Sequence, residues 1–271
     1  MLRIAIQKSG RLQEESLKLL KESGLAFSNG KDQLKTQATN FPVELLFLRD
    51  DDIPQYVEDQ VADAGIVGEN VMVEKAKKNE LVRRLDFAKC RLSIAIPRSE
   101  TYGGISSLAG KNIATSYPTI VKYFLSKHKI QAGIHEISGS VEIAPGIGLA
   151  DAICDIVSTG STLLSNGLKE VEVVMKSEAV LISTPNLATD KKEILDNLLF
   201  RIKSVQSAKN IIGRTRSLPA ADAQKIPVAV KGGAVTLTGT VHSWDERDLA
   251  TRSAGASAGL RNVVHKMSLV C

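Results

Sequence analysis

The chain has 271 residues, enough for two or three compact units, and its apolar share of 43% is ordinary for a globular protein. Of its net charge of +5, most lies in residues 211–271, where eight Lys and Arg face four Asp and Glu; the near-neutral remainder excludes a broad nucleic-acid surface. No apolar run reaches the roughly 20 residues that span a bilayer, and the N-terminus is too quickly charged for a signal peptide, which predicts a cytoplasmic protein without a transmembrane segment.

The first part of the chain alternates between apolar strands and amphipathic helices. Strands are expected at Leu2–Gln7, Val43–Leu48 and Ala62–Val67, and a helix with leucines at helical spacing at Arg11–Ser23. This alternation is typical of an α/β fold with a mainly parallel sheet.

The same pattern restarts after residue 90 and predicts a second lobe. The expected strands are Arg91–Ile96, Asn112–Thr115, Asp155–Ser158, Val171–Met175 and Ala179–Ser183. The expected helices are Pro118–Lys127, Gly148–Ile153, Thr162–Asn166 and Asp190–Val205. We therefore expect one lobe from residues 1–88 with 178–208, a second from 89–177, and ligands in the cleft between them.

The sequence pattern of alternating strands and helices ends near residue 209, which indicates a small separate α+β module at residues 211–271. Strands are expected at Ile226–Val230 and Ala234–Thr240 around a Gly-bearing hairpin turn, and a third at Asn262–Val270. A helix is expected at Trp244–Ala254.

The strongest local signal for chemistry is the segment Asp155–Thr162. A strand delivers the chain to four hydroxyl residues around Gly160, and a helix follows. The glycine allows close backbone approach, and the loop amides and helix N-terminus favour an anion such as phosphate. The candidate ligands are Asp155, Ser158, Thr159, Gly160, Ser161 and Thr162. On local features alone, a capped strand-to-helix turn without a ligand is the alternative.

Polar clusters follow three strands of the first lobe and two segments of the second. Ligands of open α/β sheets gather at the carboxyl ends of strands, so these clusters are candidates together, although each alone is more often a solvated turn. In the first lobe they contain Lys8, Gly10, Arg11, Arg49, Asp50, Glu69 and Asn70. In the second they contain Tyr117 and Glu142, with Arg91 at the crossing between lobes.

The cysteines and histidines do not add a site. The three cysteines, Cys90, Cys154 and Cys271, form no CxxC pair, and the four histidines lack metal-ligand spacing. No dedicated metal cluster is therefore expected.

Together these segments resemble the ATP phosphoribosyltransferase family through about residue 206. The matching stretches are Gln7–Leu12, Arg49–Pro54, Gly65–Asn70, Cys90–Ser93, Ile113–Pro118, Gly139–Pro145, Gly148–Gly167 and Leu168–Val173. The resemblance implies that N1 of the adenine of ATP attacks C1 of phosphoribosyl pyrophosphate, and that pyrophosphate leaves with Mg²⁺.

The resemblance also implies roles for single residues. Asp155 and the Ser158–Thr162 loop would hold the ribose and its 5-phosphate, and Glu142 would orient the ribose or the metal. Arg11, Arg49 and Glu69 would face the nucleotide and pyrophosphate. Catalytic regions of this family pair as dimers, so a homo-oligomer is expected, with a hexamer left open.

The C-terminal module departs from that family, whose long form ends in a histidine-binding regulatory domain. Residues 228–241, with Trp244, Arg247 and residues 259–264, resemble a BON domain instead. BON domains are associated with membrane-surface or partner binding. The mixture predicts an engineered chimera or an unusual fusion, without histidine feedback. The alternatives are a non-catalytic two-lobed ligand binder of the periplasmic binding-protein type, and a chimeric interaction protein.

Overall fold

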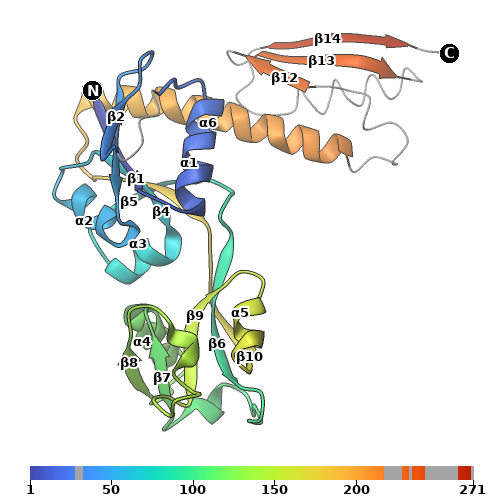
Figure 1. Ribbon diagram of the computed structural model, residues 1–271. Coiled ribbons are helices and arrows are strands. Elements are labelled where there is room, and N and C mark those ends of the chain that lie inside the picture. The colour runs from blue at the N-terminus through green and yellow to red at the C-terminus, as the bar shows by residue number, and fades with distance from the viewer. Residues whose placement is uncertain (28–32, 217–227, 232–233, 242–261, 270–271) are drawn as a thin grey trace.

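The computed structural model describes residues 1–27, 33–216, 228–231, 234–241 and 262–269 (Figure 1). It contains two larger sheets and a small C-terminal one. Among the helices so described, none combines the length and apolar character needed to cross a membrane. The expected helix at Trp244–Ala254 lies outside the described residues.

The first sheet has six strands in the order β2-β3-β1-β4-β11-β5. Their bounds are Lys35–Gln37 for β2, Val43–Leu48 for β3, Leu2–Gln7 for β1, Ala64–Gly68 for β4, Ala179–Ser183 for β11 and Glu80–Arg84 for β5. The helices beside it are α1 (Arg11–Glu22), α2 (Ile53–Glu58), α3 (Glu69–Lys75) and α6 (Thr189–Arg216), with a 3₁₀ turn at Asp50–Asp52.

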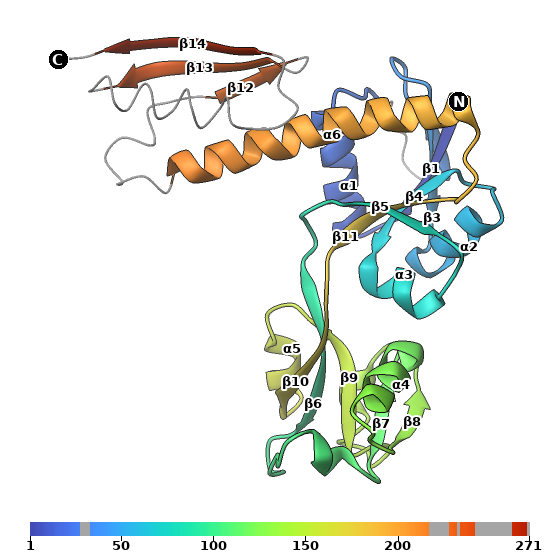
Figure 2. The same ribbon diagram turned by 180° about the vertical axis from the view of Figure 1, so that it is seen from behind.

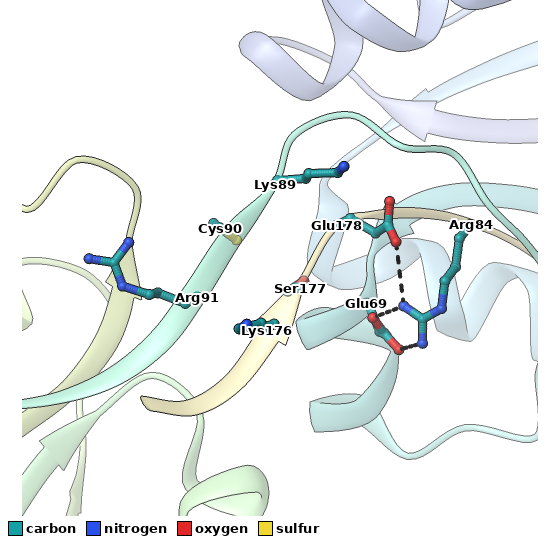
Figure 3. Close-up of a pocket in the computed structure, with 8 residues that line it drawn as sticks. All are labelled: Glu69, Arg84, Lys89, Cys90, Arg91, Lys176, Ser177 and Glu178. Atoms are coloured by element: carbon teal, nitrogen blue, oxygen red, sulfur yellow. Dashed lines mark hydrogen bonds and ion pairs between the residues drawn. The ribbon is translucent and has the colours of Figure 1, made fainter. Parts of the chain in front are cut away.

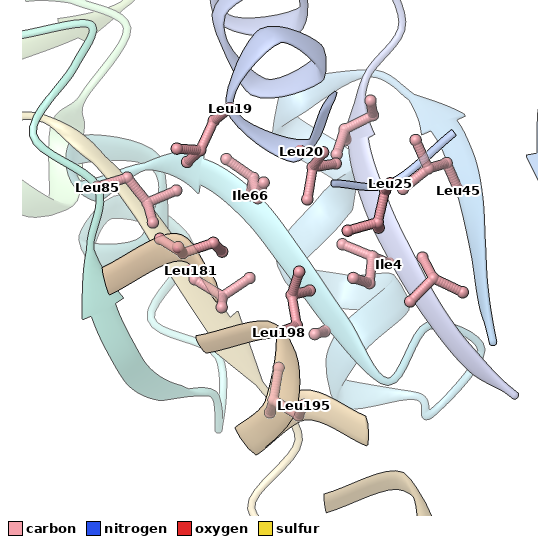
Figure 4. Close-up of a cluster of buried hydrophobic side chains, with 14 of the residues drawn as sticks. Ile4, Leu19, Leu20, Leu25, Leu45, Ile66, Leu85, Leu181, Leu195 and Leu198 are labelled. Carbon is pink, nitrogen blue, oxygen red and sulfur yellow. The ribbon is translucent and has the colours of Figure 1, made fainter. Parts of the chain in front are cut away.

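Side chains alternate across this sheet and so build a core on each face. Ile4, Leu45 and Ile66 point to one face, where leucines of α1 and α6 cover them (Figure 4). Ala5 and Val67 point to the other face and pack with residues of α2 and α3. The first lobe is therefore a sheet between two helical layers.

The second sheet has five strands in the order β10-β6-β9-β7-β8. Their bounds are Leu168–Ser177 for β10, Cys90–Pro97 for β6, Ala152–Val157 for β9, Asn112–Thr115 for β7 and Gly133–Glu136 for β8. The helices are α4 (Pro118–Lys127) and α5 (Ser161–Ser165), with 3₁₀ turns at Ile105–Leu108 and Val141–Ile143. A separate apolar core lies here, around Leu92, Ile113 and Cys154.

The chain passes between the two sheets twice, side by side (Figure 2). It enters the second sheet after β5 and returns from β10 to β11, and Cys90 pairs with Ser177 where both crossings meet the second sheet. On the far side of the crossing, the amide of Ala179 donates to Phe87 O at 2.9 Å.

Three expectations about secondary structure were wrong in detail. Both sheets are mixed rather than mainly parallel: β1 pairs in parallel with β3 and β4, but β11 runs antiparallel to β4 and β5 because it returns from the other lobe. The helix expected at Gly148–Ile153 is instead a turn followed by β9, since Gly148 has a φ of 74° and Ile153 is buried between two paired strands. The helix expected to end at Val205 continues to Arg216.

The C-terminal sheet has the order β12-β13-β14, with bounds Val228–Lys231, Ala234–Val241 and Asn262–Leu269. The first two strands pair antiparallel, as the hairpin signal predicts. The third strand pairs in parallel with β13.

Candidate functional site

The three polar clusters of the first lobe lie at one edge of its sheet. Strand β1 pairs in parallel with β3 on one side and β4 on the other, so the carboxyl ends of all three share that edge. Lys8, Arg49 and Glu69 each follow one of these ends. Gly10 has a φ of 92° in the turn that starts α1, a conformation that suits glycine.

Arg11 and Asp50 differ in how far solvent reaches them. The Arg11 guanidinium is largely exposed and binds Glu15 one turn along α1 at 2.8 Å. Burial of Cys90 at the crossing raises the pKa of its thiol. The Arg11 charge acts in the opposite direction, but its effect is smaller than that of burial. Burial, reinforced by the neighbouring Asp51, raises the pKa of Asp50. The edge thus carries an exposed cation beside a partly desolvated carboxyl group.

Glu69 is buried and forms an ion pair with Arg84, which also reaches Glu178 at 3.7 Å (Figure 3). Hydrogen bonding to Glu69 and the carboxylate charges raise the pKa of Arg84. The Glu69 carboxylate is therefore already neutralised by a protein partner. Sequence reasoning missed that partner because Arg84 belongs to a strand, β5, that it did not predict.

Asn70 ties the first lobe to the second. Its side-chain amide donates to the Tyr117 hydroxyl at 3.1 Å, and its side-chain oxygen accepts from the Ser177 hydroxyl at 2.8 Å. The Asn70 backbone amide in turn donates to Ser177 Oγ at 3.0 Å. Ser177, Asn70 and Tyr117 thus form one hydrogen-bonded chain that runs from the crossing strand through α3 to the loop before α4.

The segment Asp155–Thr162 is a strand-to-helix turn. Gly160 has a φ of 82° and precedes α5, and the hydroxyls of Thr159 and Ser161 lie 3.0 Å apart. Within residues 33–216, no acceptor lies within hydrogen-bond reach of the backbone N–H groups of Thr159 and Gly160. Two free amides beside two hydroxyls form a small concave donor site of the kind that binds anions.

Arg91 supports this loop from the neighbouring strand. Its guanidinium donates two hydrogen bonds of 2.5 Å to the Glu170 carboxylate and one of 3.2 Å to the backbone carbonyl of Ser158. Ser93 adds a bond to the same carboxylate at 2.8 Å. The structure therefore places Arg91 beneath the loop, with most of its donors occupied by the protein.

Asp155, Glu142 and Tyr117 lie close enough to affect one another electrostatically. Burial raises the pKa of Asp155, and the charge of Glu142 raises it further. Burial and then the Asp155 charge raise the pKa of Tyr117, so its hydroxyl stays neutral. The charges of Asp50 and Asp51 of the first lobe also raise the pKa of Tyr117, so carboxylates of both lobes act on its hydroxyl.

A cavity of about 400 Å³ lies at the crossing between the lobes (Figure 3). The candidates Glu69 and Arg91 line it, together with residues that the sequence did not single out: Arg84, Lys89, Cys90, Lys176, Ser177 and Glu178. Cys90 begins the matching stretch Cys90–Ser93, but only the position of the crossing could have indicated the other five residues, since none of them belongs to a recognisable motif.

Comparisons with known proteins divide the chain within α6, near residue 205. The model of the ATP phosphoribosyltransferase family matches residues 49–204, and that of the BON domain matches residues 207–270. An ATP phosphoribosyltransferase of Cytophaga hutchinsonii is 64% identical over 209 residues, which cover 77% of this chain and 73% of the relative. One of Phocaeicola vulgatus is 59% identical over 210 residues, covering 78% and 74%.

Solved structures show the same relationship. A chain of the ATP phosphoribosyl transferase (HisG:HisZ) complex from Thermotoga maritima matches with a TM-score of 0.65 at 28% identity, covering 76% of this chain and 98% of that one. A histidine kinase sensor domain similar to periplasmic binding proteins matches with a TM-score of 0.50 at 9% identity, covering 76% and 94%. The second likeness concerns the two-lobed fold alone.

Proposed function

The chain belongs to the ATP phosphoribosyltransferase family, and from the placement of its residues we propose how it binds its substrates. The activity is a pentosyl transfer, the first step of histidine biosynthesis. Adenine N1 of ATP attacks C1 of phosphoribosyl pyrophosphate, and pyrophosphate leaves. As the C1–O bond breaks, positive charge develops on the ribose, so catalysis depends mainly on positioning and electrostatics.

We propose that the second lobe holds the phosphoribosyl group. The free amides of Thr159 and Gly160 support this, because a 5-phosphate would accept from them and from the hydroxyls of Ser158, Thr159, Ser161 and Thr162. Asp155, which starts this segment, would accept hydrogen bonds from the ribose hydroxyls. Its charge and that of Glu142 would also favour the cationic ribose of the transition state.

The edge of the first lobe would face the nucleotide and the leaving pyrophosphate. Lys8, Arg11 and Arg49 supply cations there, and the turn at Gly10 lets a phosphate approach the backbone. Glu69 and Asn70 would act mainly by fixing the shape of the crossing, because Arg84 and Ser177 already occupy their side chains. Tyr117, which accepts a hydrogen bond from Asn70, would contact substrate from the side of the second lobe.

We propose that Mg²⁺ reaches this site as part of the substrate, bound to pyrophosphate. Mg²⁺ prefers oxygen ligands and is usually held by one or two carboxylates together with substrate phosphates. Asp155 and Glu142 are the carboxylates that fit this role, because the charge of Glu142 raises the pKa of Asp155.

We further propose a homo-oligomer built on dimers of the catalytic region, acting in the cytoplasm, where ATP and phosphoribosyl pyrophosphate are available. The proposed catalytic lobes are residues 1–88 with 178–208, and 89–177. The proposed C-terminal module is residues 211–271, which places its boundary inside α6.

The decisive test mixes ATP, phosphoribosyl pyrophosphate and Mg²⁺ and follows the absorbance of phosphoribosyl-ATP. We expect turnover by the parent protein, loss of most of it in Asp155→Ala and in Gly160→Val, and no change in Asp196→Ala, an exposed carboxylate on α6. The fold should survive in all three, as judged by circular dichroism. Absence of product from the folded parent protein would contradict the function, and full turnover by either loop variant would contradict the site.

We also propose that histidine does not inhibit this enzyme, because a BON domain stands where the long form of the family carries its histidine-binding domain. Activity measured against increasing histidine should stay constant. Strong inhibition at low histidine concentration would contradict this proposal while leaving the catalytic assignment intact.

A further inference from the structure

Helix α4 begins without a capping side chain of its own. Among the described residues, its N-cap residue Tyr117 makes no side-chain cap bond, and Pro118 at the first helical position has no N–H to offer. The next two amides would be unpaired in an isolated helix. Both instead donate to Glu74: Thr119 N to Oε1 at 2.9 Å and Ile120 N to Oε2 at 3.0 Å.

Glu74 belongs to the other lobe. It lies near the end of α3, which packs against the first sheet, whereas α4 packs against the second (Figure 1). A carboxylate at a helix N-terminus is favoured by the helix dipole and by the two hydrogen bonds. The two bonds use both carboxylate oxygens, so they fix the direction of α4 as well as its distance from α3.

We propose that Glu74 is a positioning residue that locks the two lobes together by capping α4 from α3. The kinetic part of this inference rests on the proposed function, since it concerns how the lobes present their substrates. Tyr117, the residue before α4, already receives a hydrogen bond from Asn70 of α3. Holding the start of α4 therefore also holds the Tyr117 hydroxyl in this contact between the lobes.

The bonds of Glu74 differ in kind from those of Asn70. Asn70 is attached to Ser177 at the crossing itself, so its bond to Tyr117 lies near the axis about which the lobes would turn. Glu74 lies one helical turn further along α3 and bonds α4 directly. Opening of the lobes would separate Glu74 from α4 and leave the Thr119 and Ile120 amides to water.

The first test compares Glu74→Ala and Glu74→Gln with the parent protein by hydrogen–deuterium exchange of the peptide that contains Thr119 and Ile120. We expect faster exchange in the alanine variant and a smaller increase in the glutamine variant, which keeps one of the two accepting oxygens and replaces the other with an NH2 group that cannot accept. Glu80→Gln, an exposed position on β5, is the matched control and should leave the peptide unchanged. Unchanged exchange in Glu74→Ala would overturn the proposed lock.

The second test is kinetic. Losing the cap lowers the population of the closed form, so KM for ATP and phosphoribosyl pyrophosphate should rise by about 2- to 30-fold, with kcat within about twofold at saturation. Faster exchange with unchanged KM would overturn the positioning role. A parent protein without activity would refute the proposed function, and the exchange experiment would still decide whether Glu74 locks the lobes.

Discussion

Replacing Arg91 with alanine should both destabilise the second lobe and loosen the Ser158–Thr162 loop. The side chain bridges β6 to β10 through Glu170 and holds the loop through the Ser158 carbonyl, at the distances of 2.5 and 3.2 Å given above. Its removal leaves the Glu170 carboxylate with the single hydrogen bond from Ser93. The activity should fall because the loop amides lose their fixed position.

The expected loss of stability follows from how far the pair is exposed. Exposed ion pairs contribute about 0–1 kcal/mol, whereas breaking a buried pair costs about 3–5 kcal/mol. The side chain of Arg91 is 34% exposed and that of Glu170 is 26% exposed, so the pair is partly screened by solvent. We therefore expect the free energy of unfolding to fall by about 1–2 kcal/mol.

Urea unfolding of the parent and of Arg91→Ala, at about pH 7 and pH 4, tests this value and its cause. Hydrogen bonding to Arg91 lowers the pKa of Glu170 below its ordinary value of 4.5. The ionised pair therefore contributes its stability above that value and loses it as the pH falls through the lowered pKa. The difference between the two proteins should be largest near pH 7 and shrink near pH 4.

Arg91→Lys is the matched variant, since it keeps the charge but cannot make the forked contact, and its loss should be intermediate. A difference that stays equal at both pH values would refute the ion pair as the cause. Equal activity of Arg91→Ala and parent would refute its support of the loop.

The remaining predictions concern three other residues. Gly65→Ala should lower the free energy of unfolding by about 1–3 kcal/mol, measured by urea denaturation, because the added Cβ would lie 2.5 Å from Ile53 Cγ2. Unchanged stability would show that the Ile53 side chain of α2 moves aside without cost. The acid limb of the pH–rate profile of kcat/KM should lie above pH 3.8, because burial raises the pKa of Asp155 and its ionised carboxylate is the proposed acceptor for the ribose hydroxyls. An acid limb below pH 3.8 would contradict this. Tyr117→Phe should cost about 1 kcal/mol of stability, measured in the same urea assay, because the buried Asn70 amide loses its acceptor, and no loss would mean that water replaces the hydroxyl.

Sequence patterns predicted the parts of this molecule that depend on neighbouring residues. The apolar run Val43–Leu48 and the leucines of α1 define their own elements, and the glycine and hydroxyls of the Asp155–Thr162 segment define its turn. The sharing of one sheet edge by Lys8, Arg49 and Glu69 followed from the expectation that their strands run parallel.

Contacts between distant residues could not be predicted in this way. Glu170 lies 79 residues from Arg91, and no local pattern indicates that the two strands pair. The same holds for Glu74, which resembles any charged residue at the end of a short helix until α4 is placed beside it. The end of α6 was missed for a different reason: the helical pattern weakens after Val205, but the helix continues through Gly213, and no proline stops it before Arg216.

The pairing of Cys90 with Ser177 has a consequence for how such a chain can be assembled. Partners across an antiparallel ladder have Cα atoms about 5 Å apart, so the segment between them leaves and re-enters the first lobe at almost the same point. The second lobe is thus an insertion whose two ends are already joined in space. Exchanging it for a homologous segment, or replacing it with a short turn, would add little loop-closure entropy to the folding of the first lobe.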